Sequence, residues 1–262
     1  MEYNILKYPR TRHIEGSRLQ KGDEDLKQIP FSVIKNKYIV IEEKVDGANC
    51  AISFDNNGNL LLQSRGHYLT GGYRERHFNF LKQWATVHKD LFYKVLGSKY
   101  IMYGEWLYAK HSIYYDSLPH YFLEFDIYDR EKNMFLDTES RHKLLEDLPV
   151  ESVPVLAKGK FNNMDDILKY LKDSNFITNN HIENLRIESE KLNLDPDRQV
   201  RETDNSKLME GLYIKVEENG EVVDRMKYVR YSFLQTVEES QTHWLDRPII
   251  PNKLDKNIND LF

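Results

Sequence analysis

The chain has 262 residues, of which 40% are hydrophobic, and its formal net charge at pH 7 is −5. This length suits one large domain or two small ones, and the negative charge argues against a protein that coats nucleic acid. No apolar run approaches the length of a membrane span, and no leader-like segment follows Met1. We therefore expect a soluble, cytoplasmic protein that does not bind a membrane.

Cysteine and histidine usage excludes two further kinds of site. Cys50 is the single cysteine and cannot form an internal disulfide, which fits a reducing compartment. The nine histidines show neither paired Cys/His spacing nor a His-Glu-x-x-His pattern. A structural or hydrolytic zinc site is therefore not expected.

Alternating or continuous apolar runs predict seven strands. They cover residues 38–45, 49–54, 59–64, 99–105, 121–128, 211–217 and 222–229. Asp46-Gly47 separates the first two and is a strong hairpin signal, and Asn56-Asn57-Gly58 is a turn sequence before the third. The first three strands are therefore expected to form a meander.

Helical periodicity predicts a helix at 77–96 and three more at about 138–148, 163–173 and 179–192. Antiparallel strands with helices grouped between them indicate an α+β fold. No linker, repeat or low-complexity tract divides the chain. We expect a single domain over residues 1–262, with a helical insert at about 138–195.

Basic residues gather in two segments, Lys7 to Arg18 and Gly72 to Lys82. Either segment offers cations for phosphate groups, although a solvated surface is the simpler explanation for each one taken singly. The first segment precedes any strand and is rich in Arg and His. An arm that grips a substrate is therefore plausible there.

Six short motifs follow one another along the chain. They are Glu43-Lys44-Val45-Asp46-Gly47-Ala48-Asn49, Ser64-Arg65-Gly66, Tyr103-Gly104-Glu105-Trp106, Phe122-Leu123-Glu124-Phe125-Asp126-Ile127, Glu210-Gly211-Leu212-Tyr213-Ile214-Lys215 and Arg225-Met226-Lys227. Each motif alone is weak, because short matches arise by chance. In this order they resemble the covalent nucleotidyltransferases, which include ATP-dependent RNA and DNA ligases and mRNA capping enzymes, and most of all the RNA ligase 2 type.

The resemblance implies a nucleotidyltransferase (ligase adenylation) fold, in which antiparallel sheets flank a nucleotide pocket. DNA ligases and capping enzymes carry an additional OB-fold domain after the last of these motifs. About thirty-five residues follow Lys227, fewer than a five-stranded barrel needs. No OB domain is therefore expected.

The implied activity is that of an ATP-dependent RNA ligase acting in RNA repair, with Mg²⁺ or Mn²⁺ as cofactor. Lys44 would attack the α-phosphate of ATP and hold AMP as a phosphoramidate. An RNA 5′-phosphate would then take over the AMP, and a 3′-hydroxyl would displace it and seal the strand. An end-healing kinase-phosphatase is a possible partner.

The resemblance also assigns roles to single residues. The catalytic set would be Lys44, Glu210, Lys215, Arg225 and Lys227. The nucleotide would be bound by Glu43 at the adenine edge, Glu105 at the ribose, Phe125 by stacking on adenine, and by Lys44, Arg65, Lys215, Arg225 and Lys227. Asn49 and Arg65 would contact the RNA 5′-phosphate, and Glu210 would support the metal. Ordinary core packing is a competing explanation for Phe125.

The nucleophile must be a neutral amine, whereas the ordinary pKa of lysine is about 10.4. Nearby cations or burial are therefore expected to lower the pKa of Lys44. Arg225 stands where the family usually has lysine; it keeps the charge but has a broader, planar donor group.

The position of Lys215 depends on strand register. A symmetric turn at Asn219-Gly220 would pair Lys215 with Asp224 and turn it away from Arg225 and Lys227. We therefore predict a bulge, or a three- or five-residue loop, between residues 216 and 224. The three cations would then converge near Lys44.

Two other functions stay open at this point. One is an mRNA capping guanylyltransferase, which the missing OB domain disfavours. The other is a catalytically silent module that binds nucleotides or RNA ends. Labelled ATP and GTP would separate the first from a ligase, and the absence of a covalent adduct would favour the second.

Overall fold

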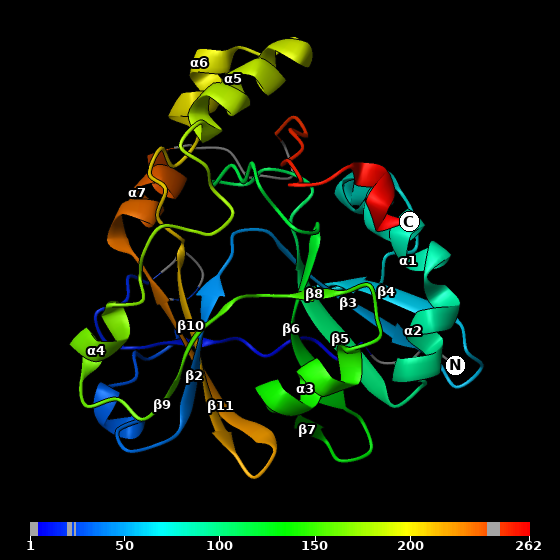
Figure 1. Ribbon diagram of the computed structural model, residues 1–262, viewed down its shortest axis with the longest axis vertical. Helices are drawn as coiled ribbons and strands as arrows, with labels where there is room; N and C mark the ends of the chain where they lie inside the picture. The colour runs from blue at the N-terminus through cyan, green and yellow to red at the C-terminus, as the bar shows by residue number, and fades with distance from the viewer. Residues whose placement is uncertain (1–4, 20–22, 24, 240–246) are drawn as a thin grey trace.

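The computed structural model describes residues 5–19, 23, 25–239 and 247–262. Two largely antiparallel sheets form its centre (Figure 1). The first has the order β1-β11-β10-β2-β9, and the second the order β4-β3-β5-β6-β7 with β8 also paired to β6. With helices around both sheets, the fold is α+β, as predicted.

The strands follow the predicted runs closely. The first sheet contains β1 (Arg12–His13), β2 (Ile39–Lys44), β9 (Val155–Gly159), β10 (Gly211–Glu218) and β11 (Glu221–Val229). The second contains β3 (Ala48–Phe54), β4 (Leu60–Ser64), β5 (Tyr100–Trp106), β6 (Phe122–Asp129), β7 (Met134–Phe135) and β8 (Glu151–Ser152).

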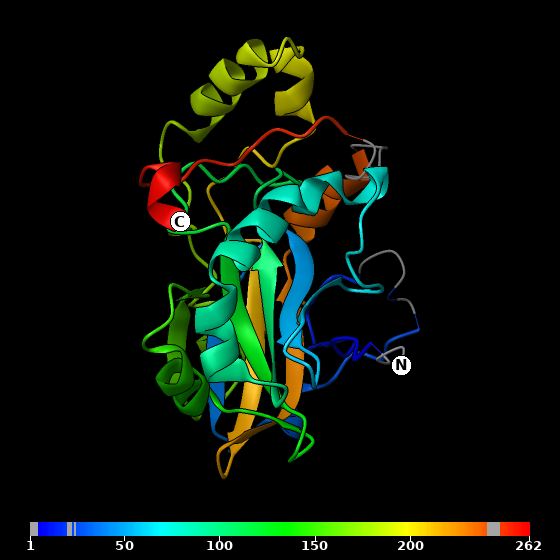
Figure 2. The same cartoon turned by 90° about the vertical axis from the view of Figure 1, so that its right-hand side faces the viewer.

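The helix predicted at 77–96 is divided into η2 (Tyr73–Phe78), α1 (Asn79–Val87) and α2 (Lys89–Leu96). The break lies at His88, whose φ of −92° and ψ of 9° are not helical. Its ring bonds to the carbonyl of Leu261. The apolar face is as expected, because Leu81, Trp84 and Phe92 are fully buried against the second sheet. Figure 2 shows α1 and α2 running along that sheet.

The segment 138–195 contains more than helices. It holds α3 (Thr138–Leu145), α4 (Met164–Leu168) and α5 (His181–Lys191), close to the three predicted helices. It also supplies β8 and β9, which were not predicted, and β9 forms the edge of the first sheet beside β2. α6 (Pro196–Arg201) follows, and α7 (Tyr231–Glu239) and η4 (Ile258–Leu261) lie nearer the end. No helix in the described ranges is long and apolar enough to cross a membrane.

The predicted meander of the first three strands is wrong. β2 pairs with β10 and β9, whereas β3 pairs with β4 and β5, so the chain leaves one sheet at Asp46-Gly47 and enters the other. Gly47 does not take the positive φ that a two-residue hairpin needs. It is required by close packing instead, because an added Cβ would lie 2.7 Å from Leu107 and from the carbonyl of Trp106.

The predicted bulge is confirmed. Lys215 pairs with Arg225 and Val216 with Asp224, but Glu217 pairs with Val222, so β11 carries one extra residue. The turn itself keeps two residues, Asn219 and Gly220, both with positive φ. Lys215, Arg225 and Lys227 therefore share one face of the sheet.

Charged side chains join the two sheets. Lys215 on β10 lies 2.9 Å from Glu42 on β2 and 3.1 Å from Asp126 on β6. Arg141 on α3 pairs with Glu42 and with Glu124 on β6. All five side chains are fully buried. We call these five residues, together with Arg225, which lies 3.6 Å from Asp126, the inter-sheet network.

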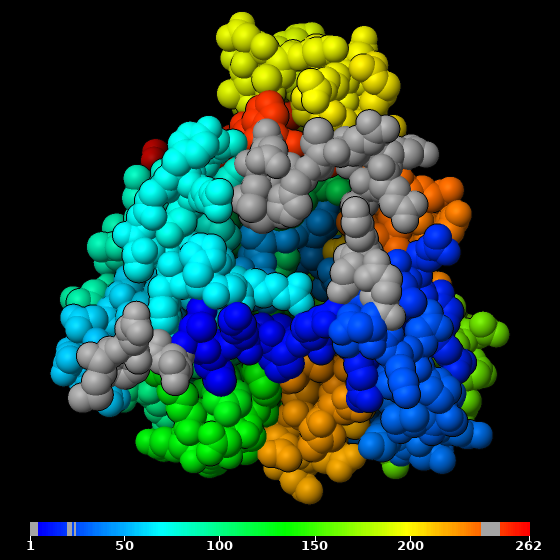
Figure 3. Space-filling model, turned by 180° about the vertical axis from the view of Figure 1, so that it is seen from behind, coloured from blue at the N-terminus to red at the C-terminus, as the bar shows by residue number. Residues whose placement is uncertain are grey.

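The N-terminal segment crosses both sheets. The Tyr8 hydroxyl donates to Asp126 of the second sheet and bonds to the hydroxyl of Tyr213 in the first. The carbonyl of Leu6 accepts from Tyr103 and Gln63. In Figure 3 this segment (dark blue) runs below a central hollow.

Candidate active site

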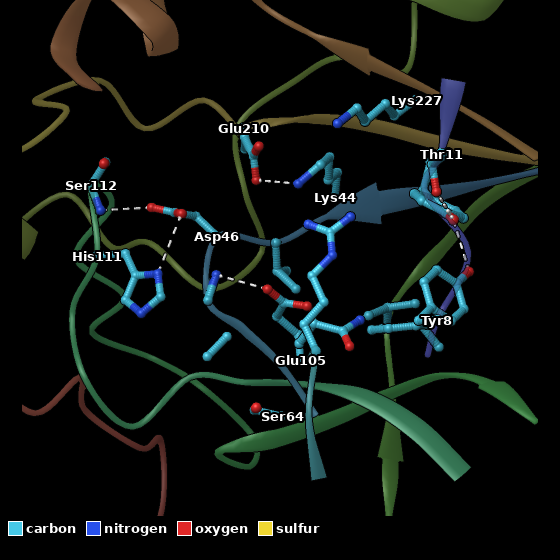
Figure 4. A pocket seen from close by; sticks show the side chains of 18 of the residues that line it. Tyr8, Thr11, Lys44, Asp46, Ser64, Glu105, His111, Ser112, Glu210 and Lys227 are labelled. Carbon is cyan, nitrogen blue, oxygen red and sulfur yellow. Dashed lines mark hydrogen bonds and ion pairs between the residues drawn. The ribbon is translucent and has the colours of Figure 1, made fainter. Parts of the chain in front are cut away.

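A cavity of about 790 Å³ opens where the strands of both sheets end. Its lining comes from the end of β2, the crossing at 45–49, the end of β4, and side chains of β5, β6, β10 and β11. Figure 3 shows the hollow from outside, and Figure 4 shows the side chains within it. Most residues that the motifs singled out lie here: Glu43, Lys44, Asn49, Arg65, Glu105, Phe125, Glu210 and Lys227.

Lys44 and Glu210 face each other inside the cavity. The Lys44 Nζ donates to the Glu210 Oε2 at 2.7 Å (Figure 4). The pair forms because Gly211, the residue after Glu210, is directly opposite Lys44 in the ladder of β10 and β2. Gly211 is needed there, because any Cβ would overlap the carbonyl of Tyr228 on β11.

The pKa of Lys44 is above its ordinary value. Burial is the largest influence and lowers it, but the carboxylates of Glu210, Glu105 and Asp46 together outweigh burial. The expected lowering of the Lys44 pKa is therefore not found in the protein without ligands, because the charges of three carboxyl groups act on this one ammonium. Burial in turn raises the pKa of Glu105 to about 8.

Of the three cations predicted to converge near Lys44, Lys227 lines the cavity and Lys215 and Arg225 do not. Lys215 lies opposite Val40, four residues before Lys44 on β2, which is about 13 Å along a strand. Its ammonium forms ion pairs with Glu42 and Asp126. The three cations share one face as predicted, but they spread along the strands instead of converging near Lys44.

Lys227 lies close enough to Lys44 for their charges to interact. Burial is the largest influence that lowers its pKa, and Lys44 lowers it further. Asp23 forms an ion pair with Lys227 and also contacts His13 and Arg10. In the first basic segment, Arg10 and His13 therefore already have a carboxylate partner and are not fully available to bind a ligand.

Asp46 holds a neighbouring loop in place. Its Oδ2 accepts from the backbone N–H groups of Ser112 and Ile113 at 2.7 and 2.9 Å. His111 and Ser112 thereby reach the cavity wall (Figure 4). Glu105 accepts from the Gly47 N–H at 3.2 Å, which fixes the crossing between the sheets.

Aromatic side chains also line the cavity. Phe125 packs edge-on against Tyr8, with 5.1 Å between ring centroids, and both rings line the cavity. The Tyr213 hydroxyl bonds to those of Tyr8 and Thr11. Phe125 is half-buried and also packs against the core, so the two interpretations of this residue are compatible.

Some residues that line the cavity lie outside the six sequence motifs. Tyr8 and Thr11 come from the N-terminal segment, and Arg247 lies far from every motif. For Arg74, the only indication in the sequence was its place in the second basic segment. These residues meet only because distant parts of the chain are folded around the strand ends.

The donor set fits a hard divalent cation bound together with phosphate groups. In the described part of the chain, no cluster of three or more His, Cys, Asp or Glu side chains is arranged as a metal site. Mg²⁺ needs only one or two carboxylates when substrate phosphates and water complete its shell. Glu210, deep in the cavity beside Lys44, meets that requirement.

Glu43 provides a test of burial in this region. Burial raises the pKa of its carboxyl from 4.5 to about 7, although the Ser174 hydroxyl donates to it. The folded protein therefore binds this proton more tightly than the unfolded chain does. The resulting stabilisation is complete below pH 4.5 and is lost as the pH rises through 7.

Glu43→Gln, which stays neutral, should therefore gain stability relative to the wild type between pH 5 and pH 8.5, by on the order of 3 kcal/mol. Urea denaturation at both pH values measures this. Glu190→Gln on the exposed face of α5 is the control and should show no such gain. An equal pH response in both variants would contradict the burial of a neutral Glu43.

Comparisons with known proteins agree with this geometry. A family model for RNA ligase matches residues 37–229. A substituted Naegleria gruberi RNA ligase with ATP and Mn is 17% identical with a TM-score of 0.54, and the match covers 88% of this chain and 58% of that one. Another substituted form, with AMP and Mn, is 15% identical with a TM-score of 0.55, covering 90% and 59%.

The likeness to these structures confirms the expected fold. This chain spans less than two thirds of the length of those ligases. A comparison with curated proteins gave no match. Because the family model covers most of its length, the chain belongs to the RNA ligase family.

Proposed function

We propose that this protein joins RNA ends in an ATP-dependent reaction, through a lysyl-AMP intermediate on Lys44. The observation that carries the proposal is the ion pair between the half-buried Lys44 and the buried Glu210, in a cavity that Lys227 also lines. The Naegleria gruberi ligase of the same fold has been solved with ATP and Mn. ATP and Mg²⁺ or Mn²⁺ are therefore the natural ligands to propose for this cavity.

In the first step, the Lys44 amine attacks the α-phosphorus of ATP. A nitrogen–phosphorus bond forms, the bond to the β-phosphate oxygen breaks, and pyrophosphate leaves. Lys44 must first lose the proton that Glu210, Glu105 and Asp46 favour. A divalent cation bound beside Glu210 would offset that carboxylate and so lower the pKa of Lys44.

In the second step, an oxygen of the RNA 5′-phosphate attacks the same phosphorus, and the bond to Lys44 breaks. In the third, the 3′-hydroxyl oxygen of the other end attacks the 5′-phosphorus, and AMP leaves. Nucleotidyl transfer depends mainly on positioning and charge neutralisation. In this proposal Lys227 binds the α-phosphate, Arg65 and Asn49 bind the incoming 5′-phosphate, and Phe125 stacks on the adenine ring; all four line the cavity.

The proposed substrate is RNA with a 5′-phosphate and a 3′-hydroxyl, as in RNA repair. An end-healing kinase and phosphatase activity would supply such ends. A panel of RNA and DNA ends, each with Mg²⁺ and with Mn²⁺, tests this directly. Joining of the RNA pair supports the proposal, whereas a covalent adduct with GTP but not ATP would favour a capping enzyme instead.

The nucleophile has a direct signature. Incubation with ATP and metal should raise the intact mass by one AMP, and Lys44→Ala should abolish the increase. Lys37→Ala, at a more exposed lysine just before β2, is the matched control and should still form the adduct. An adduct that persists in Lys44→Ala would refute the assignment, and no adduct in the wild type would indicate a silent binding module.

The structure also separates Lys215 from Lys227. Lys215→Met removes the cation between Glu42 and Asp126 and should cost about 3–5 kcal/mol of unfolding free energy, measured by urea denaturation. Lys227→Met should cost clearly less, because Asp23 keeps His13 and Arg10 as partners. It should instead slow adduct formation by roughly 100-fold or more, the typical effect of removing one charge-stabilising donor.

The opposite pattern would return Lys215 to the phosphate-binding set. That pattern is a stable Lys215→Met protein with slow adduct formation beside a Lys227→Met protein with a normal rate. Each rate is compared for the folded fraction of the sample only.

A further inference from the structure

A short loop at the cavity rim is held in a defined shape. Gly71 and Gly72, with φ of 124° and 113°, turn the chain into η2. The buried Glu75 carboxylate accepts from the N–H groups of Gly71 and Thr70 at 2.8 and 3.2 Å and pairs with Lys82 on α1. The loop therefore presents its remaining side chains from a fixed base.

Tyr73 points out of this loop into solvent. It is 79% exposed, the largest value of any large apolar side chain in the described ranges. The Arg76 guanidinium lies over its ring at 4.6 Å from the centroid, which orders the ring. Arg76 also donates to the main-chain carbonyl of Arg247 at 3.3 Å. A ring ordered from one side in this way can still stack with its other face.

The loop connects this ring to the cavity of Lys44. Arg74, next to Tyr73, lines the cavity, and so does Phe78 at the end of η2. Arg65, exposed at the end of β4, lies on the same wall. Figure 3 shows the segment around residues 60–80 (cyan) bordering the hollow. The rim therefore combines cations that face inward with an aromatic ring that faces outward.

We propose that Tyr73 stacks on the base of the RNA 5′-terminal nucleotide, whose phosphate enters the cavity beside Arg65 and Arg74. The inference rests on the proposed function and adds a determinant of substrate binding to it. A terminal 5′-phosphate is strongly anionic and needs cations, whereas a 3′-hydroxyl end carries no terminal charge, so this basic wall fits the 5′ end. Aromatic rings that stack on single-stranded bases typically contribute a fivefold to hundredfold gain in affinity.

The test crosses protein variants with RNA variants. Binding of a fluorescent 5′-phosphorylated RNA oligonucleotide is measured by anisotropy for wild type, Tyr73→Phe and Tyr73→Ala. The same RNA with an abasic first residue is the second ligand. Tyr38→Ala, at an exposed tyrosine that does not line the cavity, is the control and should bind like the wild type.

Tyr73→Ala should weaken binding of the intact RNA by about tenfold, and Tyr73→Phe should stay near the wild type. The abasic end should weaken wild-type binding by a similar factor, and on that ligand Tyr73→Ala should cause no further loss. Unchanged binding in Tyr73→Ala, a loss that persists in full with the abasic end, or no RNA binding by the wild type would each overturn the proposal.

Formation of the Lys44 adduct, which needs no RNA, is measured in the same samples. A wild type without an adduct, but with Tyr73-dependent RNA binding, would refute the ligase function and leave the stacking site standing. A normal adduct, with RNA binding that does not depend on Tyr73, would support the ligase function and refute the stacking site. A normal adduct in Tyr73→Ala also shows that the variant is folded.

Discussion

The position of the two sheets relative to each other is set by buried charges, and the cavity depends on that position. In the inter-sheet network, Lys215 lies between Glu42 of one sheet and Asp126 of the other. Burial acts to raise the pKa of Asp126, but Lys215 and Arg225 outweigh it and hold this pKa below its ordinary value. Such pairs add little net stability, yet removing one partner is very costly. The network therefore restricts how the sheets can be arranged.

The same strands continue from this network to the cavity. Glu42 and Lys44 lie on one face of β2, because side chains alternate along a strand. Glu42 belongs to the inter-sheet network and also borders the cavity, whereas Lys44, two residues later, pairs with Glu210 inside the cavity. On β11, Arg225 and Lys227 divide in the same way. Residues that look equivalent in a motif therefore lie in different surroundings: Lys215 and Arg225 join the sheets, whereas Lys44 and Lys227 line the cavity.

Alternation and turn chemistry predicted most strands, because these depend on near neighbours in the sequence. The bulge in β11 was instead predicted from the requirement that Lys215, Arg225 and Lys227 share one face. The same local signals failed at Asp46-Gly47. An Asp-Gly pair usually closes a hairpin, but here Asp46 is recruited by the backbone of Ser112 and Ile113. β9 was missed because its residues are only partly buried and show no alternation. Arg247 reaches the cavity through long-range packing that no local pattern indicates, and for Tyr8 the only local sign is its place in the first basic segment.

The proposed chemistry depends on the charge of Lys44, which Glu210 strongly influences. Burial alone would lower the pKa of Lys44, and Glu210 is the largest of the opposing influences. NMR titration of protein with ¹³C-labelled lysine side chains measures that pKa directly, with Lys44→Ala used to assign the signal. We predict a pKa above 10.5 in the wild type and a clearly lower value in Glu210→Gln. The same pKa in both proteins would contradict the claim that Glu210 controls the charge of Lys44.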